Sequence, residues 1–186
     1  STDREVWASS NDGVTWGEVA TSTSPSFASS TVFPFAIGGN AYVAFGGATS
    51  TLLFSLTSDG LAFVTALGSV SVPAGEVATV IGSESGVTFV KTTIAAYTIT
   101  NGVLTAVSDA QYPAVTVRGA VYLNGRLYVM EPDGTIWNSA EDDFTSWAGT
   151  DFIVAEFEAD GGVCLAKQGE YVIAFGQFTT EAFYDA

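Results

Sequence analysis

The chain has 186 residues, of which 47% are hydrophobic and 13% charged, so it is long enough to bury a core and too apolar to be disordered. It carries 20 acidic and 5 basic residues, and its net charge of −15 excludes recognition of a nucleic-acid backbone through a basic surface. The absence of histidine and the presence of 1 cysteine exclude a Ser–His–Asp or Cys–His catalytic arrangement, an intrachain disulfide and a cysteine metal site.

The residue types favour strands joined by tight turns. Glycine, serine, threonine, valine and aromatic residues dominate the chain, whereas leucine and the basic residues are scarce. No stretch of the sequence sustains the i, i+3, i+4, i+7 spacing of an amphipathic helix. We therefore expect an all-β protein. No apolar run approaches the roughly 18 residues of a membrane helix, so no membrane partner is predicted.

The first predicted element is a hairpin over residues 4–20, which we interpret as a partial blade. It contains SSNDGVTW at residues 9–16, which resembles the Asp-box hairpin of sialidases and other propellers, although Asn11 stands where that motif has aspartate. The motif indicates a blade hairpin and carries no catalytic information. A sialidase would also need three arginines converging on a carboxylate, and no matching context surrounds Arg4, Arg118 and Arg126.

Further repeats follow along the chain, and each consists of short strands separated by turns. The third strand of each repeat is centred on an aromatic residue, and a tight turn leads to the fourth strand. The predicted repeats span approximately residues 32–68, 76–108, 113–148 and 151–186.

Aromatic residues give the repeat a register that can be checked. They recur at intervals of 40 to 47 residues, at Trp7, Phe54, Tyr97, Trp137 and Phe183. A turn sequence such as Asn101-Gly102, which supplies the positive φ angles of a tight hairpin, follows the first four of them. The second-strand positions are predicted at Tyr42, Val87, Leu127 and Tyr171. We expect packing between neighbouring sheets, rather than ligand contact, for Phe54, Tyr97, Trp137 and Phe183.

A period of this length with four strands per repeat is typical of β-propeller blades. A single blade is too thin to bury both of its faces, so neighbouring blades must stack. We predict one domain over residues 1–186, a β-propeller-like array of antiparallel four-stranded blades with about four repeats. Four repeats are few for a closed propeller, which favours a segment of a larger ring over closure by the two chain ends. The alternative is a β-sandwich or a β-solenoid built from the same hairpins.

Carboxylate pairs are the remaining candidates for catalysis, because a glycosidase needs only two carboxyl groups. The pairs are Glu156 with Asp160 and Asp142 with Asp143. Glu156, Glu158 and Asp160 alternate along the sequence, which is the pattern of the solvated face of a half-buried strand. We therefore predict no catalytic residues and no enzyme.

Oxygen ligands of the kind that calcium prefers occur at Glu141, Asp142 and Asp143, with Asp133 in the same repeat. Their spacing is not that of a dedicated calcium loop, so we interpret them as solvated turn residues and predict no metal site. The glycine-rich stretches lack the Gly-Lys-Ser/Thr ending of a phosphate loop, so no cofactor and no cofactor-binding residue are predicted. Cys164 lies in an apolar stretch and is interpreted as a small buried hydrophobe.

The C-terminal third carries a series of short motifs. They are Gly125-Arg126-Leu127-Tyr128, Asp143-Phe144-Thr145-Ser146-Trp147, Asp151-Phe152, Ala155-Glu156, Asp160-Gly161-Gly162, Ala174-Phe175-Gly176 and Thr180-Glu181-Ala182-Phe183-Tyr184. This series resembles the packaged-DNA stabilisation proteins of short-tailed bacteriophages, also called tail accessory or nozzle proteins. The resemblance covers Val121 to Tyr184, whereas the rest of the chain agrees only in the style of its repeats.

The resemblance implies a non-enzymatic structural subunit of the virion tail. Such a subunit forms a ring with copies of itself below the portal and adaptor proteins, extends the DNA channel, and retains or guides the packaged genome. The DNA passes without being specifically bound, and an acidic wall suits that role because it does not hold phosphates. A lumen lined by the basic residues would contradict this hypothesis; they are Arg4, Lys91, Arg118, Arg126 and Lys167. Family members are much longer than this chain, which indicates a part of a larger protein.

A second hypothesis is a propeller-type binding module that recognises a carbohydrate or a receptor on a cell surface. Exposed aromatic side chains over acidic loops would favour it, and the candidates are Trp16, Trp137 and Trp147. A glycoside hydrolase is a third hypothesis, which would need two carboxyl groups about 5–10 Å apart in an open cleft.

Overall fold

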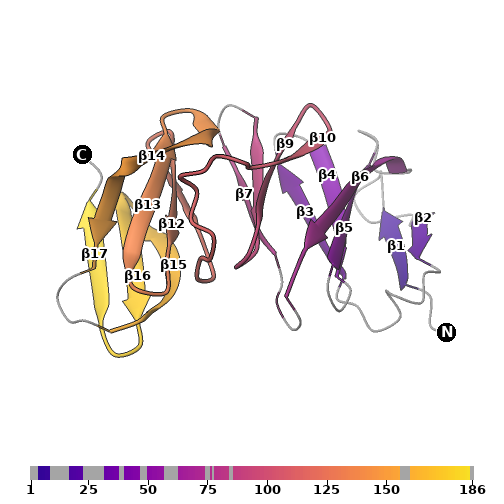
Figure 1. Cartoon of the computed structure of the whole chain (residues 1–186). Coiled ribbons are helices and arrows are strands. Elements are labelled where there is room, and N and C mark those ends of the chain that lie inside the picture. The colour runs from indigo at the N-terminus through magenta and orange to yellow at the C-terminus, as the bar shows by residue number, and fades with distance from the viewer. Residues whose placement is uncertain are drawn as a thin grey trace. The chain divides into compact units, whose positions relative to one another are not determined.

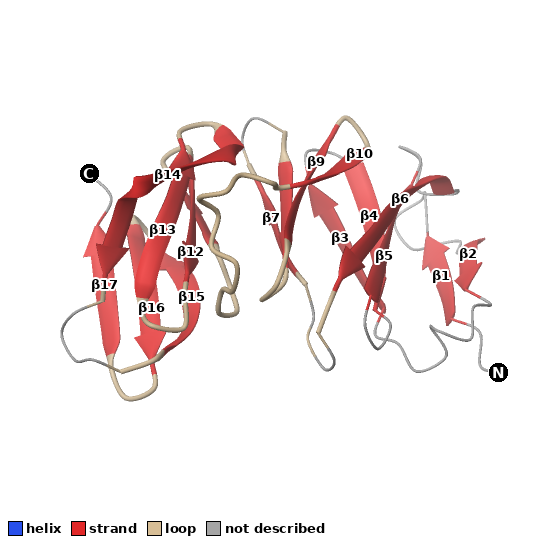
Figure 2. Cartoon of the chain, in the orientation of Figure 1, coloured by secondary structure: helices blue, strands red, loops and turns tan. Residues whose placement is uncertain are grey.

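A computed structural model describes the backbone of residues 4–8, 17–22, 32–37, 40–46, 50–56, 63–73, 76, 78–83, 86–155 and 160–184. Side chains are described for residues 68, 70–73, 76, 78–83, 86–155 and 160–184. These residues form strands and connecting loops, with no helix among them (Figure 2), so the all-β prediction is confirmed. It follows that no helix in the described part of the chain has the length and apolar character to cross a membrane.

The described strands form five antiparallel sheets, each made of strands that are consecutive in the chain (Figure 1). The first sheet pairs β1 (Arg4–Ala8) with β2 (Gly17–Ser22). The second has the order β3 (Val32–Ile37), β4 (Asn40–Gly46), β5 (Ser50–Leu56), β6 (Phe63–Ser71). The third has the order β7 (Thr79–Gly82), β8 (Thr88–Lys91), β9 (Ala96–Thr100), β10 (Val103–Ala106). The fourth has the order β11 (Val121–Leu123), β12 (Arg126–Met130), β13 (Thr135–Ala140), β14 (Asp143–Val154). The fifth has the order β15 (Gly162–Gln168), β16 (Tyr171–Gly176), β17 (Thr180–Tyr184).

The chain divides into two compact units. Unit 1 comprises Ser1–Ala78 with Thr100–Leu104, and unit 2 comprises Thr79–Ile99 with Thr105–Ala186. Most of the residues with described side chains belong to unit 2, and both the hydrophobic cores and the candidate site lie in this unit.

The aromatic residues singled out in the sequence occupy equivalent places in three successive sheets. Each lies on the third strand of its sheet, directly opposite a valine of the second strand, and the pairs are Val43 with Phe54, Val90 with Tyr97 and Val129 with Trp137. In the fifth sheet the residue at the corresponding place is Glu181, which lies opposite Ala174 of the second strand. Phe183 lies two residues further along the same face of β17, opposite Val172. The repeat inferred from the aromatic spacing is therefore a structural repeat.

Three of the four predicted second-strand positions need a correction of one or two residues. The turn of the fourth sheet pairs Leu123 with Arg126, and the turn of the fifth pairs Gln168 with Tyr171. Tyr171 is thus equivalent to Arg126 and not to Leu127. The positions that do correspond are Tyr42, Phe89, Tyr128 and Ile173, whose first-strand partners are Phe35, Ile81, Val121 and Ala166. The spacing of hydrophobic residues alone misassigned this register, because adjacent positions of these strands are both apolar.

The third and fourth sheets share a hydrophobic core. Phe89 from β8 packs with Leu127 and Val129 from β12 and with Phe144 and Trp147 from β14. All five side chains are at most 4% exposed, and the rings of Phe89 and Phe144 meet edge to face with centroids 6.1 Å apart. Burial of such side chains contributes about 1.5–3 kcal/mol each, which stabilises the stacking of one sheet on the next.

The fourth and fifth sheets share a second core built from the opposite face of β12. Tyr128 and Met130 pack with Leu165 of β15 and with Val172 and Ala174 of β16. Because side chains alternate along a strand, Leu127 and Val129 point to one neighbouring sheet and Tyr128 and Met130 to the other. The partly buried aromatics Trp137 and Phe183 pack against the first and second core respectively, which confirms their predicted role between sheets.

The segment 107–120 connects the third and fourth sheets through main-chain hydrogen bonds. The amide of Thr116 donates to the carbonyl of Thr93 at 2.9 Å, and the amide of Val117 donates to the carbonyl of Met130 at 2.7 Å. The carbonyl of Arg118 then accepts from the amide of Leu165 at 3.2 Å. Three sheets are thus held by one stretch of chain that the hydrophobic periodicity did not reveal.

Candidate functional site

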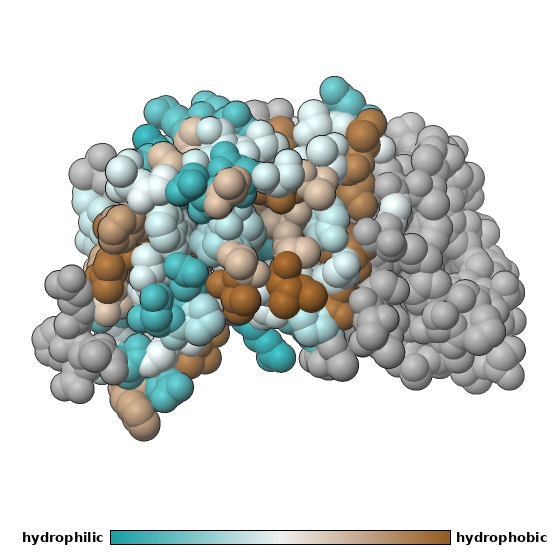
Figure 3. All heavy atoms as spheres, viewed as in Figure 1, coloured by the Kyte–Doolittle hydropathy of each residue, from teal (hydrophilic) through white to brown (hydrophobic). Residues whose placement is uncertain are grey.

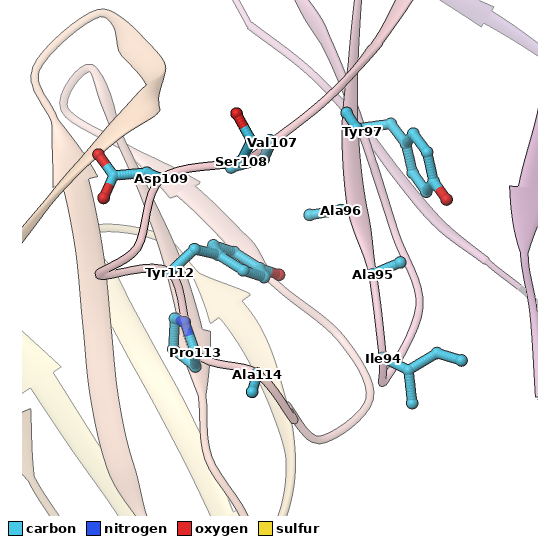
Figure 4. Close-up of a pocket in the computed structure, with 11 residues that line it drawn as sticks. Ile94, Ala95, Ala96, Tyr97, Val107, Ser108, Asp109, Tyr112, Pro113 and Ala114 are labelled. Atoms are coloured by element: carbon cyan, nitrogen blue, oxygen red, sulfur yellow. The ribbon is translucent and has the colours of Figure 1, made fainter.

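The main candidate site is a hollow between β9 and the segment 107–120, which we call the Tyr112 hollow. Its volume is about 240 Å³, and it is lined on one side by Ala95, Ala96 and Tyr97 and on the other by Tyr112 with Pro113 and Ala114. Figure 4 shows the Tyr112 ring extending from the segment towards Ala95 and Ala96 on the strand. This volume lies below the roughly 300–1,000 Å³ of sites for drug-sized ligands, so the hollow suits a small group such as one side chain of a partner.

Tyr112 provides the polar feature of the hollow. Its hydroxyl oxygen is buried and has no hydrogen-bond partner among the described residues. Burial raises the pKa of the Tyr112 phenol, and the nearby Thr116 hydroxyl, which donates its own proton to the carbonyl of Thr92, opposes that shift only in part. The phenol therefore stays neutral and retains an unused hydrogen-bonding capacity, which carries a desolvation cost of about 1–3 kcal/mol.

Asp109 and Trp147 hold the Tyr112 ring in place. The Asp109 carboxylate accepts hydrogen bonds from the amide of Gln111 at 2.8 Å and from the amide of Trp147 at 3.1 Å. These two bonds lower the pKa of Asp109, with the Gln111 bond the larger cause. The Trp147 ring meets the Tyr112 ring edge to face with centroids 5.0 Å apart. This arrangement could not be predicted from the sequence, whose only signal for it is an aspartate before a proline-containing turn at residues 109–113.

The tryptophans named as candidate ligand contacts are engaged inside the protein. Trp147 is 4% exposed, and its indole N–H donates to the carbonyl of Phe144 at 3.0 Å. Trp137 is half-buried, its indole N–H donates to the carboxylate of Glu131 at 2.7 Å, and its ring lies 5.1 Å from that of Phe152. Trp16 lies outside the described residues. An exposed aromatic platform is therefore not formed by Trp137 and Trp147, because both rings serve the packing of the fourth sheet.

The acidic residues of the β13–β14 turn shape the hairpin. Asp142 has a φ of 56°, and its amide donates to the carbonyl of Gly125 at 2.8 Å. The carboxylate of Asp143 accepts from the amide and the hydroxyl of Thr145 at 2.9 and 2.7 Å. Asp133 accepts from the amide of Thr135 at 2.9 Å in a different turn, and no group of three potential metal-ligating side chains occurs among the residues that the structure describes.

Asp160 is committed to the loop before β17. Its carboxylate accepts from the amides of Phe178 and Thr179 at 2.6 and 2.9 Å and from the hydroxyl of Thr179 at 3.0 Å. The Phe178 amide is the largest cause of its lowered pKa. Its proposed partners Glu156 and Glu158 lie outside the described residues. Because its carboxylate oxygens accept these three hydrogen bonds, Asp160 fixes the conformation of the loop before β17.

The basic residues differ in their exposure. Lys91 is 1% exposed, and its ammonium group donates to the carbonyl of Val117 at 2.6 Å. Arg126 is half-buried, and its guanidinium donates to the carbonyl of Ser139 at 3.0 Å. Arg118 and Lys167 are exposed. The side chain of Arg4 lies outside the described part. Of the four basic side chains that the structure describes, Lys91 is the buried one, so it does not lie on a surface that faces solvent.

Cys164 is half-buried on β15, next to Arg118 of the neighbouring segment, rather than fully buried as predicted. Its Cα lies opposite that of Phe175, so the two side chains share one face of the fifth sheet. The reason for the difference is that the fifth sheet packs against the fourth through its other face, which carries Leu165.

The Tyr112 hollow has the volume of a small chemical group and a largely apolar lining. Its lining is apolar apart from the neutral phenol, main-chain groups, Ser108 and Asp109. In Figure 4 the carboxylate of Asp109 points away from the Tyr112 ring, consistent with its hydrogen bond to Trp147. Binding through shape and one hydrogen bond is what this arrangement supports.

Comparison with known proteins identifies the fold. No protein-family model and no curated protein match the chain. Among solved structures, the chain is similar to the computationally designed Ika4 protein, with 11% identity, a TM-score of 0.52, and coverage of 78% of this chain and 86% of that one. It is also similar to YCF48 bound to D1 peptide, with 15% identity, a TM-score of 0.53, and coverage of 96% and 60%. A third similar structure is Hsv2p of Kluyveromyces lactis, with 12% identity, a TM-score of 0.52, and coverage of 91% and 51%.

These structures are β-propeller proteins, so the chain has the predicted β-propeller-like fold of antiparallel blades, and the sandwich and solenoid alternatives are set aside. The chain spans about 60% of the YCF48 chain and about half of the Hsv2p chain. At such low identity the similarity shows the fold alone.

Proposed function

We propose that this β-propeller-type chain is a non-enzymatic structural subunit of a bacteriophage tail, located in the virion, where it forms part of the DNA channel with copies of itself. The proposal rests on the sequence resemblance over Val121 to Tyr184 and on the net charge of −15. A strongly acidic wall repels DNA phosphates, so a duplex can slide past without being held. Portal and adaptor proteins are the neighbours that this role requires.

The observation that carries the proposal is the structural role of the motifs that make the resemblance. Leu127 and Tyr128 of the first motif face two different neighbouring sheets. Phe144 and Trp147 of the second motif fill the core between the third and fourth sheets. Asp160 of a later motif fixes the turn before β17. The shared residues therefore build and stack blades, as expected of an architectural component.

Two measurements test this proposal. Immunogold labelling of tailed particles from the native source is expected to mark the tail below the portal, and labelling of a cell-surface structure instead would overturn the proposal. In a gel-shift titration at about 50 mM salt, the chain is expected to leave a duplex of 30 base pairs unretarded, because phosphate contacts need basic side chains. Retardation that disappears with added salt would show a phosphate-binding surface and contradict an acidic wall.

A second candidate function, a binding module, is favoured by the Tyr112 hollow. The buried hydroxyl of Tyr112 has no partner in the described part of the protein and lies beside apolar side chains. A ligand that offers a hydrogen-bond acceptor next to an aliphatic group would satisfy both features, as a peptide segment or an acylated sugar does.

NMR titration of labelled protein separates the two ligand classes. The probes are N-acetylleucine methylamide for a peptide and N-acetylglucosamine for a sugar. Binding is expected to shift the amide resonances of Ala95, Ala96 and Ala114, and Tyr112→Phe is expected to weaken it about tenfold because one buried hydrogen bond is lost. If neither probe shifts these resonances at millimolar concentration, the hollow does not bind these ligand classes and this candidate function fails.

A further inference from the structure

The edge strand of the fourth sheet ends in a run of exposed apolar side chains, which we call the β14 run. It consists of Phe152, Ile153 and Val154, and all three are exposed. β14 is the last strand of its sheet, and no described strand pairs with its outer edge (Figure 1). Natural proteins protect such edges with lysine or proline, and the β14 run contains neither. An exposed apolar edge of this kind can accept an extended segment as a further strand.

The hydrogen bonds of β14 show which main-chain groups point to this edge. The amide of Ala155 donates to the carbonyl of Gly134 at 3.3 Å, on the side of β13. Main-chain groups alternate in direction along an antiparallel strand, so the amide and carbonyl of Ile153 also point to β13. Those of Phe152 and Val154 point the other way. The β14 run therefore presents two donors and two acceptors to the free edge.

The partner strand β13 agrees with this direction. Thr135 lies opposite Val154, and its carbonyl accepts from the amide of Glu131 at 2.8 Å, on the side of β12. Because Thr135 directs its carbonyl to that side, Val154 forms no main-chain hydrogen bond with it. The amide and carbonyl of Val154 are consequently left for a strand on the outer side of β14.

The way in which the described blades meet leaves this edge open. β6, β10 and β14 are the fourth strands of the second, third and fourth sheets, and each lies at the end of its sheet. Successive blades instead meet through their faces, as Phe89 of the third sheet does with Leu127 of the fourth. A further strand or blade arranged in the same manner after β17 would pair with β17 or cover a face of the fifth sheet. It would not pair with β14.

Carboxylates lie at both ends of the β14 run. Asp151 directly precedes Phe152. At the other end, Asp133 is exposed in the turn that contains Gly134, whose carbonyl is bonded to the amide of Ala155. A segment that lies along this edge thus meets negative charge on either side of a short apolar stretch.

The charge around the run is negative when its other neighbours are included. The carboxylate of Glu131 accepts from the indole N–H of Trp137, whose ring lies 5.1 Å from that of Phe152. Arg126 shares a shallow hollow with Asp151 and is the basic side chain near the run. Three carboxylates outweigh this one guanidinium, in a chain of net charge −15. This balance favours a basic partner and disfavours a second copy of the chain.

We propose that the β14 run binds an extended segment of another protein, which adds to the fourth sheet as a fifth strand. The segment has apolar residues in its centre and lysine or arginine at both ends. Main-chain hydrogen bonds to Phe152 and Val154 hold it, its apolar side chains cover the run, and its basic side chains meet Asp151 and Asp133. This site goes beyond the proposed tail function and does not depend on it.

NMR titration of the full isotope-labelled chain at low salt tests the proposal. The probe is acetyl-Lys-Val-Thr-Val-Lys-amide, and acetyl-Glu-Val-Thr-Val-Glu-amide is its matched control. The lysine peptide is expected to shift the amide resonances of Phe152 and Val154 and to slow their exchange with solvent, because these two amides gain hydrogen bonds. It is expected to bind at least tenfold more tightly than the glutamate peptide.

Substitutions separate the two parts of the recognition. Val154→Pro removes one outward amide at an edge position, where proline is tolerated, and is expected to weaken binding at least tenfold. Asp133→Asn combined with Asp151→Asn keeps an acceptor for the amide of Thr135 and is expected to reduce the preference for the lysine peptide at least threefold. Phe178→Ala, at an exposed position of the β16–β17 loop, is the control and is expected to bind like the wild type. Far-UV circular dichroism establishes that each variant folds.

Three results would overturn the proposal. The first is the absence of shifts at Phe152 and Val154 with the lysine peptide at millimolar concentration. The second is equal binding of the two peptides, which would show that charge does not select the partner. The third is self-association in sedimentation velocity that Val154→Pro abolishes, because the edge would then belong to a second copy of the chain. None of these results bears on the immunogold test of the tail function.

Discussion

Single carboxylates fix the loops that join the strands of unit 2. Asp109 accepts two backbone amides, and Asp160 accepts two backbone amides and a hydroxyl. These bonds favour the charged form, so both carboxyl groups have a pKa lowered from the ordinary value of 3.8. Both carboxylates thus accept hydrogen bonds that fix turns, whereas Glu156, which the sequence pairs with Asp160, lies outside the described residues.

Acidification should destabilise the fold through these two groups. A carboxyl group whose pKa is lower in the folded state contributes stability that is present above its unfolded pKa, near 3.8, and is lost as the pH falls through its folded pKa. Urea unfolding midpoints are therefore expected to fall more steeply between pH 5 and pH 2 for the wild type than for Asp109→Asn with Asp160→Asn. An equal fall in both proteins would show that these hydrogen bonds do not make the stability of the fold depend on pH.

The unpartnered hydroxyl of Tyr112 should cost stability in the free protein. Tyr112→Phe removes the hydroxyl and keeps the ring that meets Trp147, so the free energy of unfolding is expected to rise by about 1 kcal/mol or to stay unchanged. Urea denaturation measures this difference. Trp147→Phe is the control that removes packing and an indole hydrogen bond, and it is expected to lower the stability. A loss above about 1 kcal/mol for Tyr112→Phe would show that the hydroxyl has a partner.

Hairpins are the elements that could be predicted from the sequence, and their turns explain why. Asn101-Gly102 and Asn124-Gly125 both have positive φ angles, of 50° and 74° in the first turn and 47° and 77° in the second. Such angles suit the two-residue turns that match strand twist, and they favour asparagine and glycine. A local signal therefore marks each turn, and the aromatic third strands between the turns could be placed in equivalent positions.

Features that depend on tertiary contacts could not be predicted in the same way. The second-strand positions were off by one or two residues, since both faces of a strand such as β12 are apolar and either could be placed inward. The Tyr112 hollow depends on the segment 107–120, whose structure comes from hydrogen bonds to three sheets. Trp147 was a candidate for exposure because acidic residues precede it, yet the carbonyl of Phe144 and the ring of Tyr112 hold it inside.

The turns offer a matched pair of substitutions. Gly102→Ala is expected to cost about 1–2 kcal/mol from backbone strain alone, because no atom lies within 4 Å of the added methyl group. Gly125→Ala is expected to cost more, since the methyl group would also lie 3.0 Å from the side chain of Glu141. Chemical denaturation of both variants measures the difference. A smaller loss for Gly125→Ala would contradict the observed turn geometry.

At the scale of the molecule, stability comes from sheets that stack through alternating faces of one strand. In Figure 3 hydrophilic and hydrophobic side chains are interspersed over much of the coloured surface. Near the end of β14, Phe152, Ile153 and Val154 are 46%, 39% and 37% exposed. The strongest apolar burial instead lies between sheets, where β12 contributes to both cores.

Truncation of a β12 side chain should therefore weaken the stack. Leu127 is 0% exposed in the core between the third and fourth sheets, so Leu127→Ala is expected to lower the free energy of unfolding by about 2–5 kcal/mol. Val103→Ala is the control at a 61% exposed position of β10, where the change is expected to stay within about 0.5 kcal/mol. Equal effects of the two substitutions would contradict a core between these sheets.

Recurring hairpins supply successive blades in one common register. Cross-strand nuclear Overhauser effects in isotope-labelled protein measure that register. Contacts are expected between Val43 and Phe54, between Val90 and Tyr97, and between Val129 and Trp137, each on the second and third strands of its own sheet. If any of these contacts is absent and the aromatic residue lies opposite a different residue of the second strand, the common register is wrong.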